Sequence, residues 1–307
     1  MILSRISADT LSVFKTFDHK KLPSHLTIQS LDGDYSMLEE LPAQGLAIVG
    51  TRYPQQRSIE LLEEAMYDLR NTRLIIVSGF ARGIDSHAHE LAIQYGLRTI
   101  AFLGNGIGQT YPKENAPLRE SVIQSGGLII SQFEADAKPL PKNFFDRNGL
   151  IAGFSKATWV VEAAEVSGTL NTASWASQLN RDLYATSCFP ADHYYQGNVK
   201  LLSQRHPDRY PFAHSFFSAQ SLGSTWPDLA NQSLKQTSLA LSLNPKSEIQ
   251  RWVIELQSRA GECMVQALME YAGKKGYTPG KFYHLFEAEI EAGMLVHDSS
   301  GRVDLMA

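Results

Sequence analysis

The chain has 307 residues, of which 43% are hydrophobic and 20% charged, so we expect a soluble globular protein with at least two domains. A net charge of −4 and a pI near 6.1 argue against a surface coated in basic residues, so any phosphate-bearing partner must be held by a local cluster. No run approaches the roughly 18 apolar residues of a membrane span, and the start, MILSRISADTLSVFKTF, lacks the apolar centre of a secretory signal. Cys188 and Cys263 are too far apart to indicate a disulfide framework or a thiolate zinc site. We therefore expect a cytoplasmic protein without a membrane partner.

Short apolar runs alternate with helical patterns through the middle of the chain. Residues 1–44 form a lead-in to which we assign no element. The apolar runs, typical of strands buried on both faces, occupy residues 46–49, 74–77, 99–103, 128–130, 158–161 and 183–185. Helical patterns lie between them at 57–70, 84–95, 115–125 and 168–179. This alternation predicts right-handed βαβ units, and hence an α/β, Rossmann-like domain with a doubly wound, mostly parallel sheet over residues 45–203.

The last third of the chain has a different organisation. Residues 204–246 are rich in Ser, Gln and Pro and are interpreted as a connector. Helical patterns at 247–258, 262–272 and 279–292 precede two short apolar runs around Ser-Ser-Gly, which predicts a small winged-helix-like domain over 247–307. Residues 262–307 carry four Lys or Arg against seven Asp or Glu, and the last helix includes Glu287, Glu289 and Glu291. This charge favours a protein contact or a structural role over DNA reading.

Glycine, hydroxyl and basic residues follow four of the predicted strands. The segments are Gly50-Thr51-Arg52, Gly79 to Gly83 with Arg82 between, Gly104 to Lys113, and Ser167-Gly168-Thr169. Because the carboxyl ends of parallel strands share one edge of a sheet, these loops should lie together, with helix N-termini that attract anions. We interpret this edge as a phosphate-binding face. Tight turns with solvated charges are the simpler alternative.

The sequence offers little support for a nucleotide cofactor, a metal site or a catalytic site. Neither G-x-G-x-x-G nor G-x-x-x-x-G-K-[ST] occurs, so we expect no nicotinamide cofactor or P-loop nucleotide, and no cofactor of another kind. His87 and His89 are two residues apart and should face different sides of a helix, whereas a helical metal pair needs a spacing of four, so the spacing argues against a metal site. Asp85 is interpreted as a helix cap, and the two histidines as helix-surface residues. We predict no catalytic or metal residues, although Glu162 could either orient a loop or act as a base.

The order of these motifs resembles the DNA-processing protein A family (DprA, also called Smf). The matching segments, over about residues 40–200, are GTR at 50–52, SGFARGIDSHAH at 78–89, GNGIGQTYPKEN at 104–115, FFDRNGLIAGFS at 144–155 and VEAAEVSGTLNTA at 161–173. The resemblance implies an extended Rossmann-like domain, often followed by a winged-helix-like one. It also implies a non-enzymatic protein that binds single-stranded DNA, forms a homodimer, protects incoming strands in natural transformation and helps to load the recombinase RecA.

Transferred to this sequence, the family pattern makes Arg52 and Lys113 phosphate contacts. It places Phe144 where a base would pack, with Lys142, Arg147 and Asn148 beside it. Two departures occur in this motif, which usually reads F-P-x-R-N-R: Phe145 replaces the proline, and Gly149 replaces the second arginine and so removes a cation. The segment FPADHYYQGN also lacks the usual Pro-Gly.

Two alternatives share the wider fold. One is a nucleotide-monophosphate phosphoribohydrolase of the lysine-decarboxylase-like (LOG) type, with Glu162 in the site. Residues 165–169, Glu-Val-Ser-Gly-Thr, lack the first two glycines of the Gly-Gly-x-Gly-Thr loop that such enzymes use to hold a phosphate closely. The other is a nucleotide-sensing domain. Binding of an oligonucleotide would indicate the DNA-binding protein, and release of a base from nucleoside monophosphates would indicate the phosphoribohydrolase.

Overall fold

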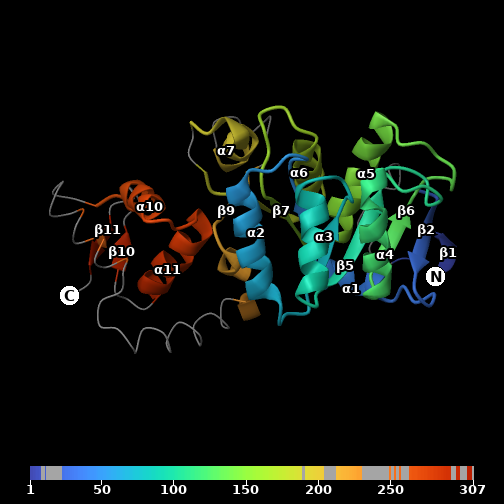
Figure 1. Ribbon diagram of the computed structural model, residues 1–307, viewed down its shortest axis with the longest axis horizontal. Coiled ribbons are helices and arrows are strands. Elements are labelled where there is room, and N and C mark those ends of the chain that lie inside the picture. Colours follow the sequence, from blue (N-terminus) through green and yellow to red (C-terminus); the bar gives the residue numbers. More distant parts are fainter. Residues whose placement is uncertain are drawn as a thin grey trace. The chain divides into compact units, whose positions relative to one another are not determined.

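The computed structural model describes residues 1–7, 11, 23–188, 191–203, 212–229, 249, 252–253, 256, 263–291, 295–297 and 303–305. It separates into two compact units, Met1–Phe216 and Phe217–Ala307 (Figure 1). The domain limits predicted above, at 44/45, 203/204 and 246/247, stay a prediction. Most of the connector at 204–246, and all of the helix expected at 247–258 except residues 249, 252, 253 and 256, lie outside the described residues.

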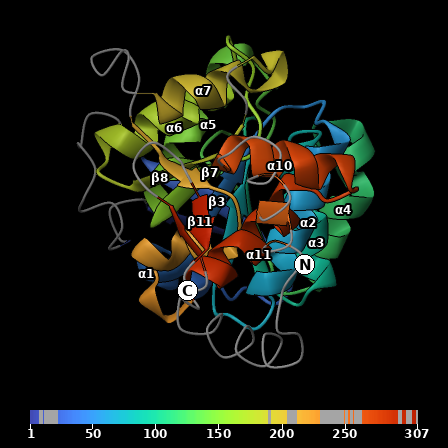
Figure 2. The same ribbon diagram turned by 90° about the vertical axis from the view of Figure 1, so that its left-hand side faces the viewer.

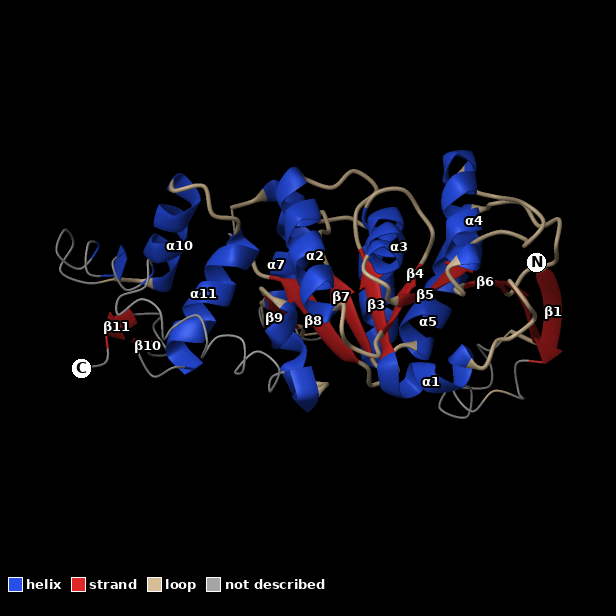
Figure 3. Cartoon of the chain, turned by 60° about the horizontal axis from the view of Figure 1, so that its bottom comes forward, coloured by secondary structure: helices blue, strands red, loops and turns tan. Residues whose placement is uncertain are grey.

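The described part of the first unit is built on a nine-stranded sheet in the order β1-β2-β6-β5-β4-β3-β7-β8-β9, which Figure 3 shows from one side to the other. Strands β3 to β9 run parallel, whereas β1 and β2 join antiparallel at one edge. The strands are β1 (Ile2–Ser7), β2 (His25–Ser30), β3 (Gly45–Val49), β4 (Ile75–Ser78), β5 (Arg98–Leu103), β6 (Leu128–Ser131), β7 (Ala157–Val160), β8 (Asp182–Thr186) and β9 (His214–Phe216).

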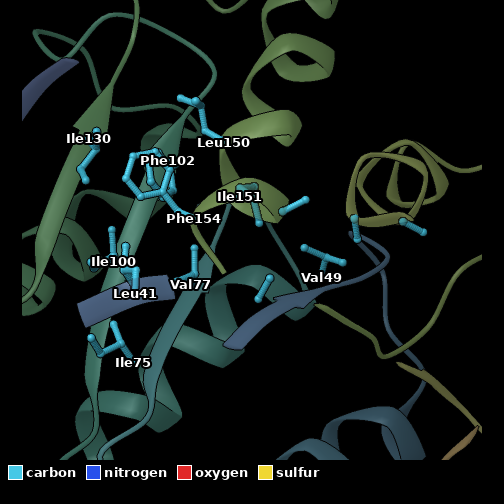
Figure 4. Close-up of a cluster of buried hydrophobic side chains, with 14 of the residues drawn as sticks. Leu41, Val49, Ile75, Val77, Ile100, Phe102, Ile130, Leu150, Ile151 and Phe154 are labelled. Carbon is cyan, nitrogen blue, oxygen red and sulfur yellow. The ribbon is translucent and has the colours of Figure 1, made fainter. Parts of the chain in front are cut away.

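Helices cover both faces of this sheet, as the end-on view of Figure 2 shows for α3 and α4 on one side and α5 and α6 on the other. One layer contains α2 (Gln56–Leu69), α3 (Ile84–Gln94) and α4 (Ala116–Gln124). The opposite face carries α1 (Met37–Gln44), α5 (Pro141–Phe154) and α6 (Thr169–Gln178), and α7 (Gln196–Leu202) follows β8. Apolar side chains of α1, α5 and α6 meet alternate strand residues, including Val77 and Phe102, in one core (Figure 4), and those of α4 meet Leu103 and Ile129 in a second core on the other face. Burial of these side chains on both faces explains the unbroken apolar runs of the central strands.

The path of the chain through the sheet creates a switch point. From β3 the chain builds outward through β4, β5 and β6, and then crosses back to place β7 on the other side of β3. The loops after β3 and β7 therefore diverge to opposite faces of the sheet. In open α/β sheets such a divergence leaves a crevice at the carboxyl ends of the strands.

The predicted α/β fold with a mostly parallel, doubly wound sheet is confirmed, and each apolar run identified in the sequence forms a strand between β3 and β8. The four helices expected between those runs are α2, α3, α4 and α6. Strands β1, β2 and β9 and helices α1, α5 and α7 were not predicted. Strand β9 has only three residues, and α1 contains Pro42, so neither has a strong periodic signal.

The second unit has its own hydrophobic core, which includes Leu268, Phe282, Leu295 and Val303. It contains α10 (Val265–Lys274), α11 (Pro279–Glu291) and an antiparallel hairpin of β10 (Leu295–His297) and β11 (Val303–Leu305). These elements match the helices and hairpin expected there. No helix in the described part of the chain combines the length and apolar character needed to cross a membrane.

Candidate functional site

A cleft of about 570 Å³ opens at the switch point between β3 and β7. Its lining comes from residues 49–53 after β3, from residues between 139 and 151 in and before α5, and from residues between 164 and 172 after β7. Ala81, Asp85 and Tyr111 complete it. The cleft therefore lies at the sheet edge that the sequence indicated, and it is formed mainly by three of the loops at that edge.

The loop after β3 is held by backbone hydrogen bonds on both sides. The Thr51 N–H donates to the Glu162 carbonyl at 2.9 Å, and the Thr51 carbonyl accepts from the Ile84 N–H at 3.1 Å. Gly83 has φ +72°, and a side chain there would overlap the carbonyls of Thr51 and Arg52. Gly83 thus lets the start of α3 approach this loop. The side chain of Arg52 stays exposed at the cleft.

The buried side chain of Glu162 holds the segment that follows β3. Its side chain is 1% exposed, and its carboxylate accepts hydrogen bonds from the Gln55 N–H at 2.8 Å and from the Ser58 hydroxyl at 2.6 Å. Burial raises the pKa of Glu162, and these two hydrogen bonds oppose the rise. The described lining of the cleft does not include Glu162. Of the two roles left open by the sequence, these contacts favour loop orientation over action as a base.

Aromatic side chains gather at the mouth of the cleft. The Phe144 ring lies 5.7 Å from the Tyr111 ring, with the Arg52 guanidinium carbon 5.9 Å from its centroid. Tyr53 is 75% exposed, and Phe145 is 50% exposed. The sequence reasoning named Phe144 but missed Tyr53, Tyr111 and Phe145 as site residues. A signal was present, because Tyr-Pro follows in two of the loops, at 53–54 and 111–112, and Phe145 adjoins Phe144.

The predicted cations divide into exposed and engaged side chains. Lys113 at the start of a short 3-10 helix (Lys113–Asn115), and Lys142 in the first turn of α5, are both exposed. Arg82 is also exposed, but its Nε donates to the carboxylate of Glu114. Arg82 and Gly79 line a small hollow beside the cleft, together with Arg52, Tyr111 and Phe144. Of the cations predicted for this edge, Arg52, Lys113 and Lys142 thus have no acidic partner among the described residues.

Arg147 lies in the floor of the cleft and is only 4% exposed. Its guanidinium donates to the carbonyls of Gly79 and Phe102, and the carboxylate of Asp85 lies beside it above Gly79. Burial lowers the pKa of Arg147 to about 10, although Asp85 opposes the shift, so the side chain stays charged at neutral pH. Burial likewise raises the pKa of Asp85, and Arg147 opposes that rise.

One expectation from the sequence is wrong at this position. Asp85 does not cap α3, because the helix begins after Gly83 and the Asp85 carboxylate accepts instead from the Ala81 N–H, at 3.3 Å. Arg147, which was expected beside Phe144 in a DNA-binding region, is buried and donates to two backbone carbonyls, and a contact of this residue with DNA stays a prediction. The two residues together hold the ends of β4 and β5 against α5.

His89 also differs from its expected position. His87 lies at the surface, with Nδ1 3.3 Å from the carboxylate of Glu90, but His89 is fully buried. The Thr99 hydroxyl donates to the Ile76 carbonyl at 3.0 Å, so it accepts from the His89 Nδ1–H at 2.7 Å. Burial, aided by the charge of Arg147, lowers the pKa of His89 to about 3. His89 is thus a neutral core residue. No group of three or more His, Cys, Asp or Glu side chains in the described part of the chain could hold a metal.

The loop after β7 forms the wall opposite Arg52. Gly50, Thr51, Asn148, Ser167, Gly168 and Thr169 all line the cleft. The Ser167 hydroxyl accepts from the Thr169 N–H at 3.2 Å, at the start of α6, and Asn148 donates to Asn171 at 3.2 Å.

The glycine loop after β5 has a different role, because the N–H groups of Gly106 and Gly108 donate to the carbonyls of Ala137 and Ala135. Those glycines bind the neighbouring loop rather than face the cleft.

Comparison with known protein families matches residues 15–208 to the family described as DNA recombination-mediator protein A. Protein Smf of Synechocystis sp. is 39% identical over 158 residues, which cover 52% of this chain and 39% of that protein. Protein Smf of Escherichia coli is 40% identical over 151 residues, which cover 48% and 40%. The chain thus spans about two fifths of the length of these relatives.

Solved structures agree with these matches. DNA processing protein A from Streptococcus pneumoniae is 27% identical and superposes with a TM-score of 0.62, over 72% of this chain and 74% of that one. DNA processing protein A from Helicobacter pylori also has a TM-score of 0.62, over 74% and 96%, at 24% identity. The second similarity concerns the fold alone.

Proposed function

The chain belongs to the DNA recombination-mediator protein A family, and we propose that it binds single-stranded DNA in the cleft at the β3–β7 switch point. The observation that carries this proposal is a cleft lined by the exposed Arg52 and Tyr53 and the half-buried Phe144. The exposed Lys113 and Lys142 are next in sequence to Pro112 and Pro141, which line the adjoining hollow and the cleft. Arg52, Lys113 and Lys142 can neutralise backbone phosphates, while Phe144 and Tyr53 offer ring faces to unpaired bases. Both kinds of contact tolerate any sequence, so we propose binding without base specificity.

The proposed role is non-enzymatic. Glu162, the acid that a phosphoribohydrolase would need, is occupied by Gln55 and Ser58 and is not part of the described cleft lining. We further propose that the chain acts in DNA uptake and recombination as a homodimer that assists a RecA-type recombinase. These finer roles rest on the family. The proposal includes a cytoplasmic location, which two widely separated cysteines favour.

The main test is a titration of fluorescent oligo-dT at several salt concentrations. If three cations neutralise phosphates of a single strand, log K should fall against log salt with a slope of roughly −2. An affinity that does not change between low and physiological salt would contradict the proposal. The same protein should release no base from nucleoside monophosphates. Release of a base would favour the phosphoribohydrolase, and saturable nucleotide binding without oligo-dT binding would favour a nucleotide sensor.

Three variants locate the site. Arg52→Ala should weaken binding of all oligonucleotides alike, by about tenfold or more, because it removes a charge-assisted contact. Phe144→Ala should cost about 1–3 kcal/mol through the loss of one stacked base. Arg82→Ala is the matched control, since Arg82 lies on the same edge but is engaged by Glu114, and it should weaken binding less than Arg52→Ala. If Arg52→Ala and Phe144→Ala both melt and bind like the wild type, the site lies elsewhere.

A further inference from the structure

Three lysines lie together at the turn between α10 and α11 in the second unit. Lys274 and Lys275 end α10, and Lys281 lies in the first turns of α11. All three side chains are exposed, and none has an acidic partner among the described residues. We call this group the turn lysines.

The turn that carries them is defined by its capping. Gly276 has φ +85°, and its N–H donates to the Gly273 carbonyl at 3.0 Å, while the Tyr277 N–H donates to the Ala272 carbonyl at 3.1 Å. This pair of bonds is a Schellman motif, which ends α10 with a left-handed glycine. Thr278 then caps α11, because its hydroxyl accepts from the Lys281 N–H at 3.3 Å, ahead of Pro279 in the first helical position. The backbone on both sides of the turn lysines is therefore fixed.

The rings beneath the turn lysines are already in use. Lys275 Nζ lies 5.3 Å from the Tyr271 ring centroid, and Lys281 Nζ lies 4.5 Å from that of Tyr277. Trp252 packs edge-on against Tyr277, with ring centroids 5.0 Å apart. The two tyrosines thus hold the lysine stems in place, and their faces are not open to a base. The turn offers point charges to a partner and no ring for stacking.

The acidic side chains of this unit that the structure describes form no ion pair with the turn lysines. Glu289 is 2% exposed and belongs to the interior, and the Glu287 carboxylate accepts a hydrogen bond from Ser218 at 3.5 Å. Both are in the second half of α11, about two helical turns from Lys281. Glu270 is exposed one turn before Lys274 but forms no ion pair with any described residue. Of these three acids, two lie toward the end of α11 and only Glu270 is near the turn lysines, and none is paired with them.

We propose that the turn lysines form a second nucleic-acid contact, which binds the phosphate backbone of duplex DNA. Lysine ammonium groups suit phosphates as point charges. A duplex presents about one negative charge per 1.7 Å of its axis, a denser target than a single strand. The absence of free rings among the described residues of this turn separates it from the cleft of the first unit, which combines rings with cations. The contact reads no sequence and is independent of the cleft at β3 and β7.

The test compares two probes of equal length on the full chain at low salt: a duplex of about 20 base pairs, two helical turns, and oligo-dT. Substitution of all three lysines by alanine should weaken duplex binding by about tenfold or more and reduce its salt slope by roughly 2.7, the value for three phosphates. Binding of oligo-dT should not change. Glu270→Lys adds a cation to the same surface, and it should tighten duplex binding and leave oligo-dT binding unchanged.

Melting of each variant is measured first, and Lys281→Gln replaces the triple change if folding suffers. Three outcomes overturn the inference: a wild type that does not bind the duplex, variants that bind the duplex as the wild type does, or equal loss of both probes. Equal loss would assign the lysines to the single-strand path. Failure of the cleft is seen separately, through Arg52→Ala and Phe144→Ala on oligo-dT, so the two proposals succeed or fail independently.

Discussion

The side chains at the cleft differ in burial: Arg52 is exposed, Phe144 is half-buried, and Arg147 is 4% exposed. Arg52 and Phe144 were expected at the sheet edge because each follows a recognisable motif, and both line the cleft. Arg147 and His89 look equally suitable for chemistry in the sequence, yet both are buried. Burial depends on which elements pack over a residue, and no local pattern around Arg147 records that Gly79 and Phe102 accept its hydrogen bonds. An arginine can therefore be available to a ligand, as Arg52 is, or support the fold, as Arg147 does.

The buried His89 makes stability depend on pH. The unfolded chain takes up a proton on His89 near its ordinary pKa of 6.5, whereas the folded chain resists protonation down to about 3. Acid therefore favours the unfolded state between these values, and the contribution of His89 to the pH dependence fades as the pH rises above 6.5. We predict that between pH 7 and pH 5 the free energy of unfolding falls by about 2 kcal/mol more in the wild type than in His89→Asn. Urea unfolding at both pH values measures this.

Asn is the matched replacement because its side-chain N–H can occupy the place of Nδ1–H and donate to Thr99. The variant should be less stable at pH 7 through its smaller volume, and only the difference between the two pH values tests the prediction. Equal losses in both proteins would mean that His89 is protonated in the folded state within this range.

At the scale of elements, the sequence predicted what its periodicity could encode. The central strands are buried on both faces, so their apolar runs were clear. Helix α5 was missed because Asn143, Asn148, Gly149 and Gly153 give it weak intrinsic helix propensity. Packing against α6, β3 and β5 stabilises it instead. The site depends on this helix, because α5 carries Lys142, Phe144 and Arg147. An element that the periodicity did not predict therefore positions three of the proposed site residues.

Gly149 illustrates this packing. A Cβ at this position would lie 3.2 Å from the Trp175 ring of α6, so Gly149 faces the α5–α6 contact rather than the cleft. We predict that Gly149→Arg, which restores the residue usual in the family motif, lowers the free energy of unfolding by about 1–3 kcal/mol through overpacking. It should not tighten oligo-dT binding. Denaturant unfolding and the oligo-dT titration measure the two effects.

Gly149→Ala is the control for this change. Its added methyl group is also crowded, but alanine gains about 1 kcal/mol of helix propensity over glycine, so the two effects should nearly cancel. A Gly149→Arg protein that melts as the wild type does and binds oligo-dT with a steeper salt slope would place the new guanidinium on the DNA-binding face, and would contradict the packing described here.

For the whole molecule, average charge proved a poor guide to local charge. A net charge of −4 coexists with Arg52, Lys113 and Lys142 at the sheet edge of the cleft and with the turn lysines, all without an acidic partner in the described part of the chain. In the second unit the count of seven acids against four bases treated Glu289 as a surface charge, although it is buried. Composition sets the long-range field, but a partner that touches a few residues responds to where the charges lie. Only the folded arrangement supplies that information.

The two units have separate cores, which leads to a prediction about their stability. Phe282 is fully buried among apolar side chains of the second unit, including Leu268 and Val303. Phe282→Ala should cost that unit about 3–5 kcal/mol, the usual range for a large cavity, and calorimetry should show its transition at a lower temperature. The transition of the first unit and the affinity for oligo-dT should stay unchanged, because the cleft is built from the first unit alone.

The matched control is Phe154→Ala, which leaves a cavity in the core of the first unit where Phe154 meets Phe102, with ring centroids 5.1 Å apart. It should shift the other transition and weaken oligo-dT binding at temperatures where the first unit begins to unfold. If Phe282→Ala lowers both transitions together, the chain unfolds as one cooperative body and the separation of its cores has no energetic counterpart.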